Sequence, residues 1–464
     1  MIKKLLLFAV VVFVGKSLTA QVWTQQNTQF TDLATYVGVD QISIVDENIV
    51  WINGFNGTST GGRIKAYAHT NDGGTTWVPG HFTQFTATEF PNVIAASSYD
   101  YGYAVVMDTV SSATSFWSTA DGGTTWVKKT AMFTGASSFV DGVRFWDSQK
   151  GFAYGDPNGG KFEIYLTSDG GLTWTINSNA PAPSPANEYG FNGFECSATV
   201  AGGIGFIMTD HGRILKTTDY GTTWAPTPTA PFTSPATAFG SNKVYASSAN
   251  YIICATYVTS TTTWTWKITT DGGTTWNAYT HAGAFYDFAM CYAPGSPNTF
   301  ISTSPSTTTT MGVSYSTDGG LNWTDYTDAL LQPSGTNIQC LGVGYATQQT
   351  GWVGNYDAGA AINSILKYYD PTVGVNLLNT INGNDVNIYP NPSNGVVNFS
   401  VNGPNNDNIN IKVFDIVGKL VFSEIMNVNG LKNTSYNFSS YAKGMYIAHI
   451  QSGNDLKTQK FVVQ

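Results

Sequence analysis

The sequence predicts an all-β chain: a seven-bladed β-propeller followed by a small immunoglobulin-like β-sandwich. Three observations lead to this fold class. A phrase of eight residues occurs six times, and its aspartates lie 47 to 52 residues apart, a spacing typical of propeller blades. A seventh unit continues in phase, since Asp370 lies 52 residues after Asp318. Residues 386–464 alternate short apolar runs with polar turns, which indicates a small sandwich.

The repeated phrase is expected to form a tight hairpin. Its first copy runs Thr-Asn-Asp-Gly-Gly-Thr-Thr-Trp from Thr70 to Trp77. Glycine supplies the positive φ of the turn, and the aspartate caps the backbone amides of its own turn. The tryptophan at the end of the phrase is expected to pack between neighbouring sheets. We therefore interpret the six aspartates as structural: Asp72, Asp121, Asp169, Asp219, Asp271 and Asp318.

This phrase resembles the Asp-box, or bacterial neuraminidase repeat, of sialidase-like and sortilin-like propellers. Only Tyr220 and Asn322 vary from the pattern Ser/Thr-x-Asp-x-Gly-x-Thr-Trp. The resemblance implies that each box joins the third and fourth strands of a blade. It indicates a fold rather than a function, because such boxes occur in sialidases, xyloglucanases, sortilin-type receptors and photosystem assembly factors.

Residues 1–20 have the pattern of a secretory signal peptide. A basic start is followed by an apolar run from Leu5 to Val14 and by small residues up to Ala20. The run is too short for a stable membrane span, and no later stretch is long and apolar enough to cross a bilayer.

The composition argues against nucleic-acid binding and against a metal or cofactor. The net charge is -9, and the only arginines are Arg63, Arg144 and Arg213, so no basic stripe is available. The five histidines lack metal-ligand spacing, and one carboxylate per turn falls short of the oxygen ligands that calcium needs. Both disulfides and buried free thiols remain open for the four cysteines, Cys196, Cys254, Cys291 and Cys340.

Residues 21–370 are expected to form one closed propeller. The chain leaves the seventh unit before its fourth strand, and the stretch Val22–Gln26 has the same pattern as the residues after each repeated turn. The N-terminal strand would then complete the last blade and leave no open sheet edge. Six or eight blades are the alternatives. In the third unit, strands are expected at 140–145, 151–155, 161–167 and 172–176.

A ligand is expected on the face formed by the blade-to-blade loops and the second-to-third loops, where the inner strands converge. Counting back from the turn 147–150 places Asp141 opposite Asp156, and such a carboxylate pair would raise one pKa toward that of a general acid. The alternative is that these carboxylates are solvated or cap turns. The ligand-face candidates are Asp141, Arg144, Asp156, Glu188, Glu195, Asp210, Asp287 and Asp357.

Typical sialidase chemistry is not expected. It needs three arginines that converge on a carboxylate, and only Arg144 falls on an inner strand. No residue is identified as catalytic. The sequence favours a binding or scaffold role toward a carbohydrate or a protein, and the alternative is a glycoside hydrolase or another polysaccharide-processing enzyme.

After a linker at 371–385, residues 386–464 resemble the type A C-terminal sorting domain of the type IX secretion system of Bacteroidota. Short strands are expected near 396–401, 409–414, 420–425, 435–438, 444–450 and 458–463. The resemblance implies export to the cell surface or the medium, with the secretion machinery as partner; an ordinary immunoglobulin-like module is the alternative. The motif residues are Tyr389, Pro390, Asn391, Pro392, Gly395, Gly418, Gly444 and Tyr446.

Overall fold

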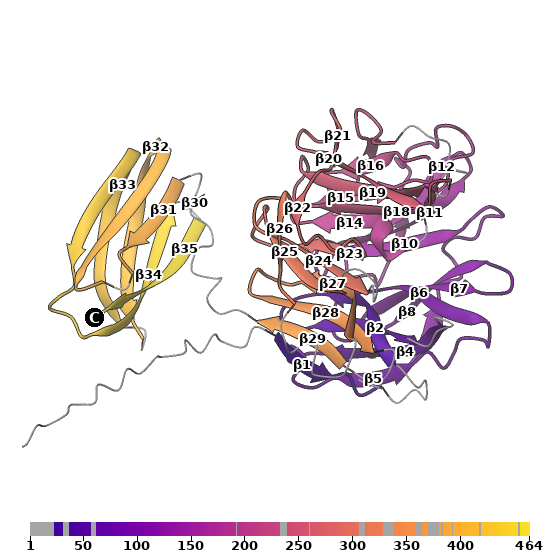
Figure 1. Ribbon diagram of the computed structural model, residues 1–464, viewed down its shortest axis with the longest axis horizontal. Coiled ribbons are helices and arrows are strands. Elements are labelled where there is room, and N and C mark those ends of the chain that lie inside the picture. The colour runs from indigo at the N-terminus through magenta and orange to yellow at the C-terminus, as the bar shows by residue number, and fades with distance from the viewer. Residues whose placement is uncertain are drawn as a thin grey trace, which may run out of the picture.

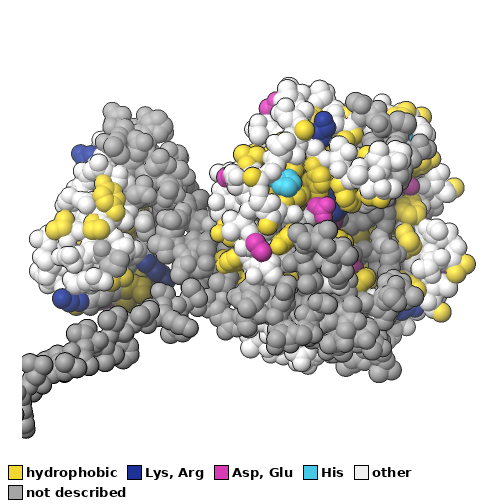
Figure 2. Space-filling view, viewed as in Figure 1, with side chains coloured by type: hydrophobic (Ala, Val, Ile, Leu, Met, Phe, Trp, Pro, Cys, Tyr) yellow, Lys and Arg dark blue, Asp and Glu magenta, His cyan; other side chains and the backbone are white. Residues whose placement is uncertain are grey.

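A computed structural model describes residues 23–30, 37–56, 62–191, 193–232, 239–258, 260–305, 311–327, 338–357, 364–369, 380–381, 384–391, 393–416, 419–452 and 455–464. This part of the chain consists of β-strands and one short 3-10 helix, which confirms the all-β class. It holds no helix with the length and apolar character of a membrane span. The predicted signal peptide, Pro392 and Gly418 lie outside the described residues. Charged side chains are sparse on the described part of the face drawn in Figure 2, as expected from a chain with 11% charged residues.

Seven sheets of the described chain follow one another between residues 23 and 369 (Figure 1). The first four are β2 (Val37–Ile44), β3 (Val50–Asn56), β4 (Gly62–Thr70), β5 (Val78–His81); β6 (Glu89–Ala96), β7 (Gly102–Asp108), β8 (Thr114–Thr119), β9 (Val127–Lys128); β10 (Val140–Phe145), β11 (Gly151–Asn158), β12 (Lys161–Thr167), β13 (Thr175–Ile176); and β14 (Ser197–Val200), β15 (Ile204–Met208), β16 (Ile214–Thr217), β17 (Ala225–Pro226).

Two of the remaining three sheets differ from the first four in their outer strands. One is β18 (Phe239–Ala246), β19 (Ile252–Val258), β20 (Thr263–Thr269) and β21 (Asn277–Ala278). The next is β23 (Ala289–Tyr292), β24 (Phe300–Pro305), β25 (Met311–Ser316) and β26 (Asn322–Asp325), with β22 (Ala282–Gly283) added in parallel to β26. The last is β27 (Ile338–Tyr345), β28 (Thr350–Asp357), β29 (Ser364–Tyr369) and β1 (Trp23–Asn27).

The sheets form a ring. The first strand of each contacts the first strand of the next, in the order β2, β6, β10, β14, β18, β23 and β27, and β27 contacts β2 again. Apart from β22, neighbouring strands within each sheet are antiparallel, and hairpins connect those that follow one another in the sequence. A ring of such sheets with one strand of each at the centre is a β-propeller.

The N-terminal strand closes this ring. β1 pairs antiparallel with β29, and Trp23 is the register partner of Tyr368. The indole ring is 1% exposed and packs 5.3 Å from the Tyr368 ring and 6.0 Å from the Tyr326 ring of the preceding sheet. The outer edge of the last sheet is therefore supplied by residues far away in the sequence.

The repeated turns all connect third and fourth strands, and one hydrogen-bond pattern recurs in all six. In the first, the Thr70 hydroxyl donates to Asp72 Oδ1 (2.9 Å) and accepts from Gly74 N–H (2.9 Å), while Asp72 Oδ1 accepts from Thr76 N–H (2.8 Å). The same three bonds occur at Asp121, Asp169, Asp219, Asp271 and Asp318. The carboxylates of these aspartates are therefore occupied by hydrogen bonds within their own turns.

The turns also bind the preceding sheet. Glycine carbonyls of the turns accept hydrogen bonds from neighbouring side chains, for example from Tyr67 to Gly123 (2.7 Å) and from Asn177 to Gly221 (2.7 Å). The tryptophans that end the repeated phrases are buried or half-buried in clusters that join two adjacent sheets. The repeat therefore provides the packing between blades as well as the hairpin.

The C-terminal part forms a separate sheet around its own core. Its strands are β30 (Thr380–Ile381), β31 (Asn384–Tyr389), β32 (Val396–Asp415), β33 (Leu420–Asn437), β34 (Gly444–Ser452) and β35 (Asp455–Val463). The expectation of separate short strands at 396–401 and 409–414, and at 420–425 and 435–438, is wrong. β32 changes partner from β31 to β34 but pairs with β33 along its length, with a register shift between Gly403 and Asp407.

Candidate functional site

Residues 177–196 form the connection between the third and fourth sheets, which we call the long loop. It is longer than any other connection between successive propeller sheets in the described chain, and Asn192 within it is not described. Most of the side chains that define the candidate site belong to this loop or pack against it.

Glu188 anchors the long loop from beneath. Its carboxylate is fully buried and forms a two-pronged ion pair with Arg213, with 2.7 Å between Arg213 Nε and Oε1. Thr209 Oγ1 donates to Oε1 (2.6 Å) and Ser184 N–H donates to Oε2 (2.8 Å). These bonds occupy the Glu188 carboxylate and fix the loop. The structure therefore places this predicted ligand-face residue in a supporting role.

The next residues of the loop are held against two strands. Asp210 Oδ1 accepts from Tyr189 N–H (2.8 Å) and lies 2.7 Å from His211 Nδ1. Asp156 Oδ1 accepts from Gly190 N–H (2.9 Å), and Gly190 forms an isolated β-bridge with Thr209. The loop backbone is thus fixed beside the carboxylates of Asp210 and Asp156. The Tyr189 side chain is 51% exposed and lies at the surface.

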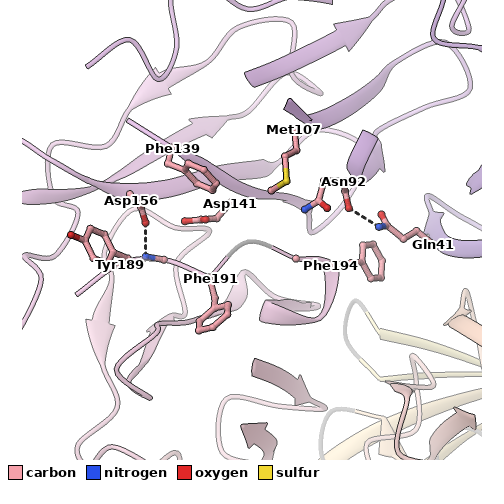
Figure 3. A pocket seen from close by; sticks show the side chains of 11 residues that line it. Gln41, Asn92, Met107, Phe139, Asp141, Asp156, Tyr189, Phe191 and Phe194 are labelled. Carbon is pink, nitrogen blue, oxygen red and sulfur yellow. Dashed lines mark hydrogen bonds between the residues drawn. The ribbon is translucent and has the colours of Figure 1, made fainter. Parts of the chain in front are cut away.

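A cavity of about 530 Å³, which we call the loop cavity, opens beside these contacts (Figure 3). Its walls combine four aromatic rings with two carboxylates and two amides. The lining side chains are Phe139, Tyr189, Phe191, Phe194, Met107, Asp141, Asp156, Gln41 and Asn92. A concave site of this size with a few converging polar groups is the usual form of a small-ligand site.

The register between β10 and β11 differs from the expected one. Phe145, rather than Trp146, lies opposite Gly151, and Asp141 is an extra residue between Val140 and Gly142. Asp156 is likewise an extra residue between Gly155 and Pro157 where β11 pairs with β12. Both aspartates therefore sit at β-bulges, which re-aim side chains, and bulges rather than direct cross-strand pairing bring them to one cavity.

The two aspartates have unusual electrostatics. Burial raises the pKa of Asp141 well above its usual range, and the nearby charges of Asp156 and Asp210 raise it further. Burial also raises the pKa of Asp156 to about 7, although the hydrogen bond from Gly190 favours the ionised form. Asp141 is 1% exposed, so it forms the floor of the cavity, whereas Asp156 lies nearer to solvent.

Arg144 lies on the other side of a plug in the centre of the ring. The plug is the 3-10 helix η1 (Phe194–Cys196), and Phe194 lines the loop cavity as well as a second cavity of about 360 Å³ among the inner strands. The Arg144 guanidinium packs 3.8 Å from the Phe194 ring centre, donates to Ser197 Oγ (3.1 Å) and bonds the Phe194 carbonyl. Its role here is to hold the plug.

The remaining candidates are separated from the aspartate pair. Glu195 lines the second cavity, among the inner strands, where burial raises its pKa while Tyr245, Lys243 and Arg144 favour its ionised form. Asp287 lines a third cavity. The Asp357 side chain lies outside the described residues.

The four cysteines are free thiols, and burial raises the pKa of Cys196 and Cys340 to about 12. Within the described part of the chain, no group of three or more His, Cys, Asp or Glu side chains is arranged to hold a metal ion.

Sequence reasoning did not identify Tyr189, Phe194 or Lys243. One signal was available: the interval between the third repeated turn and the next inner strand is long and contains Pro181, Pro183 and Pro185. Loops that exceed the common connection length are often functional.

The chain is similar to several solved structures, while no curated protein matches it. One of these structures is YCF48 bound to D1 peptide, with 14% identity, 75% of this chain and 97% of that chain covered, and a TM-score of 0.45. Another is an ancestral GH74 enzyme, with 11% identity, 96% of this chain and 63% of that chain covered, and a TM-score of 0.42. A third is the NanB sialidase of Streptococcus pneumoniae, with 11% identity, 74% of this chain and 70% of that chain covered, and a TM-score of 0.35.

One family model matches the C-terminal part of the chain. Tyr389 ends β31, Asn391 and Gly395 lie in the connection to β32, and Gly444 and Tyr446 lie in β34 of the same sheet. Asn391 fixes the motif to the last strand, since its side chain bonds the Lys460 carbonyl (3.1 Å) and the Val462 N–H (2.9 Å). Residues 387–464 match the secretion system C-terminal sorting domain, which implies export through the type IX secretion system.

Proposed function

We propose that this protein is exported to the cell surface or the medium and binds a neutral glycan at the loop cavity of its propeller. The proposed organisation is a signal peptide at 1–20, a propeller at 21–370, a linker at 371–385 and a sorting domain at 386–464. The seven sheets act as one seven-bladed unit that β1 closes, and the repeated turns are Asp-boxes. The secretion machinery is the partner of the last domain.

The single observation that carries the binding role is the composition of the loop cavity. Aromatic rings lie on its walls, and the carboxylates of Asp141 and Asp156 lie among them. Aromatic faces are electron-rich and attract the C–H groups of a sugar ring, while carboxylate and amide groups bond hydroxyls. A site with two carboxylates and no lining Lys or Arg disfavours an anionic ligand.

Glycoside hydrolysis is the second candidate, and one observation favours it. A carboxyl group with a pKa of about 7, as at Asp156, is suited to act as a general acid at neutral pH. The second carboxylate that hydrolysis requires would be Asp210 or Asp141. Asp210 is engaged with Tyr189 N–H and His211, and Asp141 is buried against the long loop. Binding without cleavage is therefore the stronger proposal.

A glycan array probed with the full-length protein tests this function. Titration calorimetry with the best neutral oligosaccharide should then show that Tyr189→Ala lowers affinity about tenfold, or about 1.4 kcal/mol. Tyr369→Ala is the matched control, because Tyr369 is 52% exposed and does not line the loop cavity. If the protein binds peptides but no glycan, its ligand is a protein. If it releases sugar from a bound glycan, it is a glycoside hydrolase.

A further inference from the structure

The third cavity, which Asp287 lines, lies beside the loop cavity. It has a volume of about 570 Å³ and is lined by Tyr257, Trp264, Phe288, Asp287 and Lys243 among others. We call it the aromatic cavity. Phe288 is 41% exposed and Trp264 is half-buried, so large rings are available to a ligand without unfolding.

The rings of the aromatic cavity are fixed in place. Lys243 lies beneath them, with Nζ 4.2 Å from the Trp264 ring centre and 5.6 Å from that of Phe288. The same ammonium donates to the carbonyls of Asp287 (2.7 Å) and Phe288, which holds that segment against β18. Tyr257 packs edge-on to Trp264, with ring centres 5.6 Å apart. A preformed site loses little entropy when it binds a ligand.

The two cavities are adjacent and share part of their walls. Gly193 and Phe194 line both of them. The Arg144 guanidinium packs on Phe194 from the other side and fixes this shared wall in place. Phe194 is therefore a wall common to the loop cavity, which Tyr189 and Asp156 line, and to the aromatic cavity, which Trp264 and Asp287 line.

We propose that the aromatic cavity is a second sugar subsite, so that the ligand is an oligosaccharide of several neutral hexopyranose units rather than a single sugar. This inference rests on the proposed glycan-binding function. Trp264 and Phe288 offer faces for the C–H surfaces of a sugar ring, and the exposed Asp287 carboxylate accepts hydrogen bonds from hydroxyls. The ammonium of Lys243 already serves two carbonyls and an aromatic face, which suits a neutral ligand better than an anion.

Calorimetry with the disaccharide and the hexasaccharide of the best neutral glycan on the array tests the second subsite. The wild-type protein should bind the hexasaccharide at least tenfold more tightly than the disaccharide. Trp264→Ala should remove most of that difference and change disaccharide affinity less than twofold, and Trp264→Phe should keep most of it. Tyr369→Ala should change neither affinity. If the Trp264→Ala variant does not fold, Phe288→Ala allows the same comparison, because the Phe288 ring is more exposed.

The outcomes separate this inference from the function on which it rests. If both saccharides bind but neither Trp264→Ala nor Phe288→Ala affects the hexasaccharide, the second subsite is wrong and glycan binding stands. Equal affinity of the wild-type protein for both saccharides also overturns it. If no neutral glycan binds, both proposals fail. Protection of Trp264 from hydroxyl-radical oxidation by the hexasaccharide, and not by the disaccharide, would support the subsite in the unmodified protein.

Discussion

Gly190 lies so close to Asp141 that a Cβ added to the glycine would overlap Oδ2 of the aspartate. The glycine cannot move away, because its N–H bonds Asp156 and its backbone bridges Thr209. Its backbone is not in the left-handed region, so space and not conformation requires a glycine here. A side chain at residue 190 would therefore require the Asp141 carboxylate or the long loop to shift.

Gly190→Ala should destabilise the protein by about 1–3 kcal/mol through overpacking and should weaken ligand binding. Thermal melting and calorimetry measure the two effects. The double variant Gly190→Ala/Asp141→Ala removes the overlap, so its loss of stability should be smaller than the sum of the two single losses. Additive losses would show that the contact with Asp141 does not determine the loop position.

Trp23→Ala should lower the free energy of unfolding by about 3–5 kcal/mol, because it empties a fully packed site between the last sheet and the preceding one. Chemical denaturation followed by circular dichroism measures the change. Thr24→Ala is the matched control, since Thr24 lies in the same strand and is exposed. A Trp23→Ala variant as stable as this control would contradict a ring that depends on β1.

The strands of the third sheet could be predicted closely from the sequence. Strands expected at 140–145 and 161–167 agree with β10 and β12, because alternating apolar residues and Asp-Gly turns are local signals. The strand expected at 151–155 extends to residue 158 in β11, and the one expected at 172–176 is shortened to 175–176 in β13. The position of Trp23 could also be predicted, since it repeats the pattern of the turn tryptophans. The long strands β32 and β33 could not, because the Gly403-Pro404 pair marks a break by local rules while pairing with β33 continues beyond it.

The candidate site was predicted only in part, and for a physical reason. Two β-bulges bring Asp141 and Asp156 together, and a bulge has no reliable local signature. The walls of the cavity depend on the long loop and on η1, which are fixed by distant contacts such as Glu188 with Arg213 and Arg144 with Phe194. Charge type and strand phase suggested Glu188 and Arg144 as ligand-face residues, but these contacts use both side chains to support the site.

The turn aspartates should make the propeller sensitive to strong acid. Side-chain and backbone hydrogen bonds from Asn322 hold the pKa of Asp318 at about 2, below the usual 3.8, and bonds from Thr275 do the same for Asp271. A depressed carboxyl pKa adds stability above about pH 4, and that stability is lost as the pH falls through about 2. Asp318→Asn should lower the denaturation midpoint at pH 6 and have a smaller effect at pH 2. An equal effect at both values would exclude the charge as the cause.

Deletion of residues 386–464 should leave a folded propeller inside the cell envelope of the native host. The deleted segment contains the matched sorting domain, and the propeller core and the sorting-domain core are separate residue clusters. Immunoblots of medium, surface and periplasmic fractions measure the outcome, and replacement of Tyr369 by alanine in the complete chain controls for a change outside the sorting domain. Normal amounts of the truncated protein in the medium would contradict the sorting role.

Asp156 gives a pH test that separates binding from hydrolysis. Its pKa of about 7 means that the carboxyl group ionises across neutral pH. If it accepts hydrogen bonds from sugar hydroxyls, affinity should rise as the pH increases from 6 to 8, because the ionised form is the stronger acceptor. If it is a general acid, turnover should fall over the same range, because the fraction of enzyme with a protonated Asp156 decreases as the pH rises. Asp156→Asn should abolish either dependence.

The same variant should also change stability with a defined sign. A carboxyl pKa raised by burial means that the unfolded chain ionises first, so stability falls as the pH rises from about 4 to about 7 and is level above it. Asp156→Asn keeps an oxygen that can accept from Gly190 N–H but removes the buried charge, so it should raise the melting temperature at pH 8 and leave it nearly unchanged at pH 4. A variant that melts lower than the wild-type protein at pH 8 would show that the ionised carboxylate stabilises the loop, and the rise in affinity with pH would then have to be assigned to the loop rather than to the ligand.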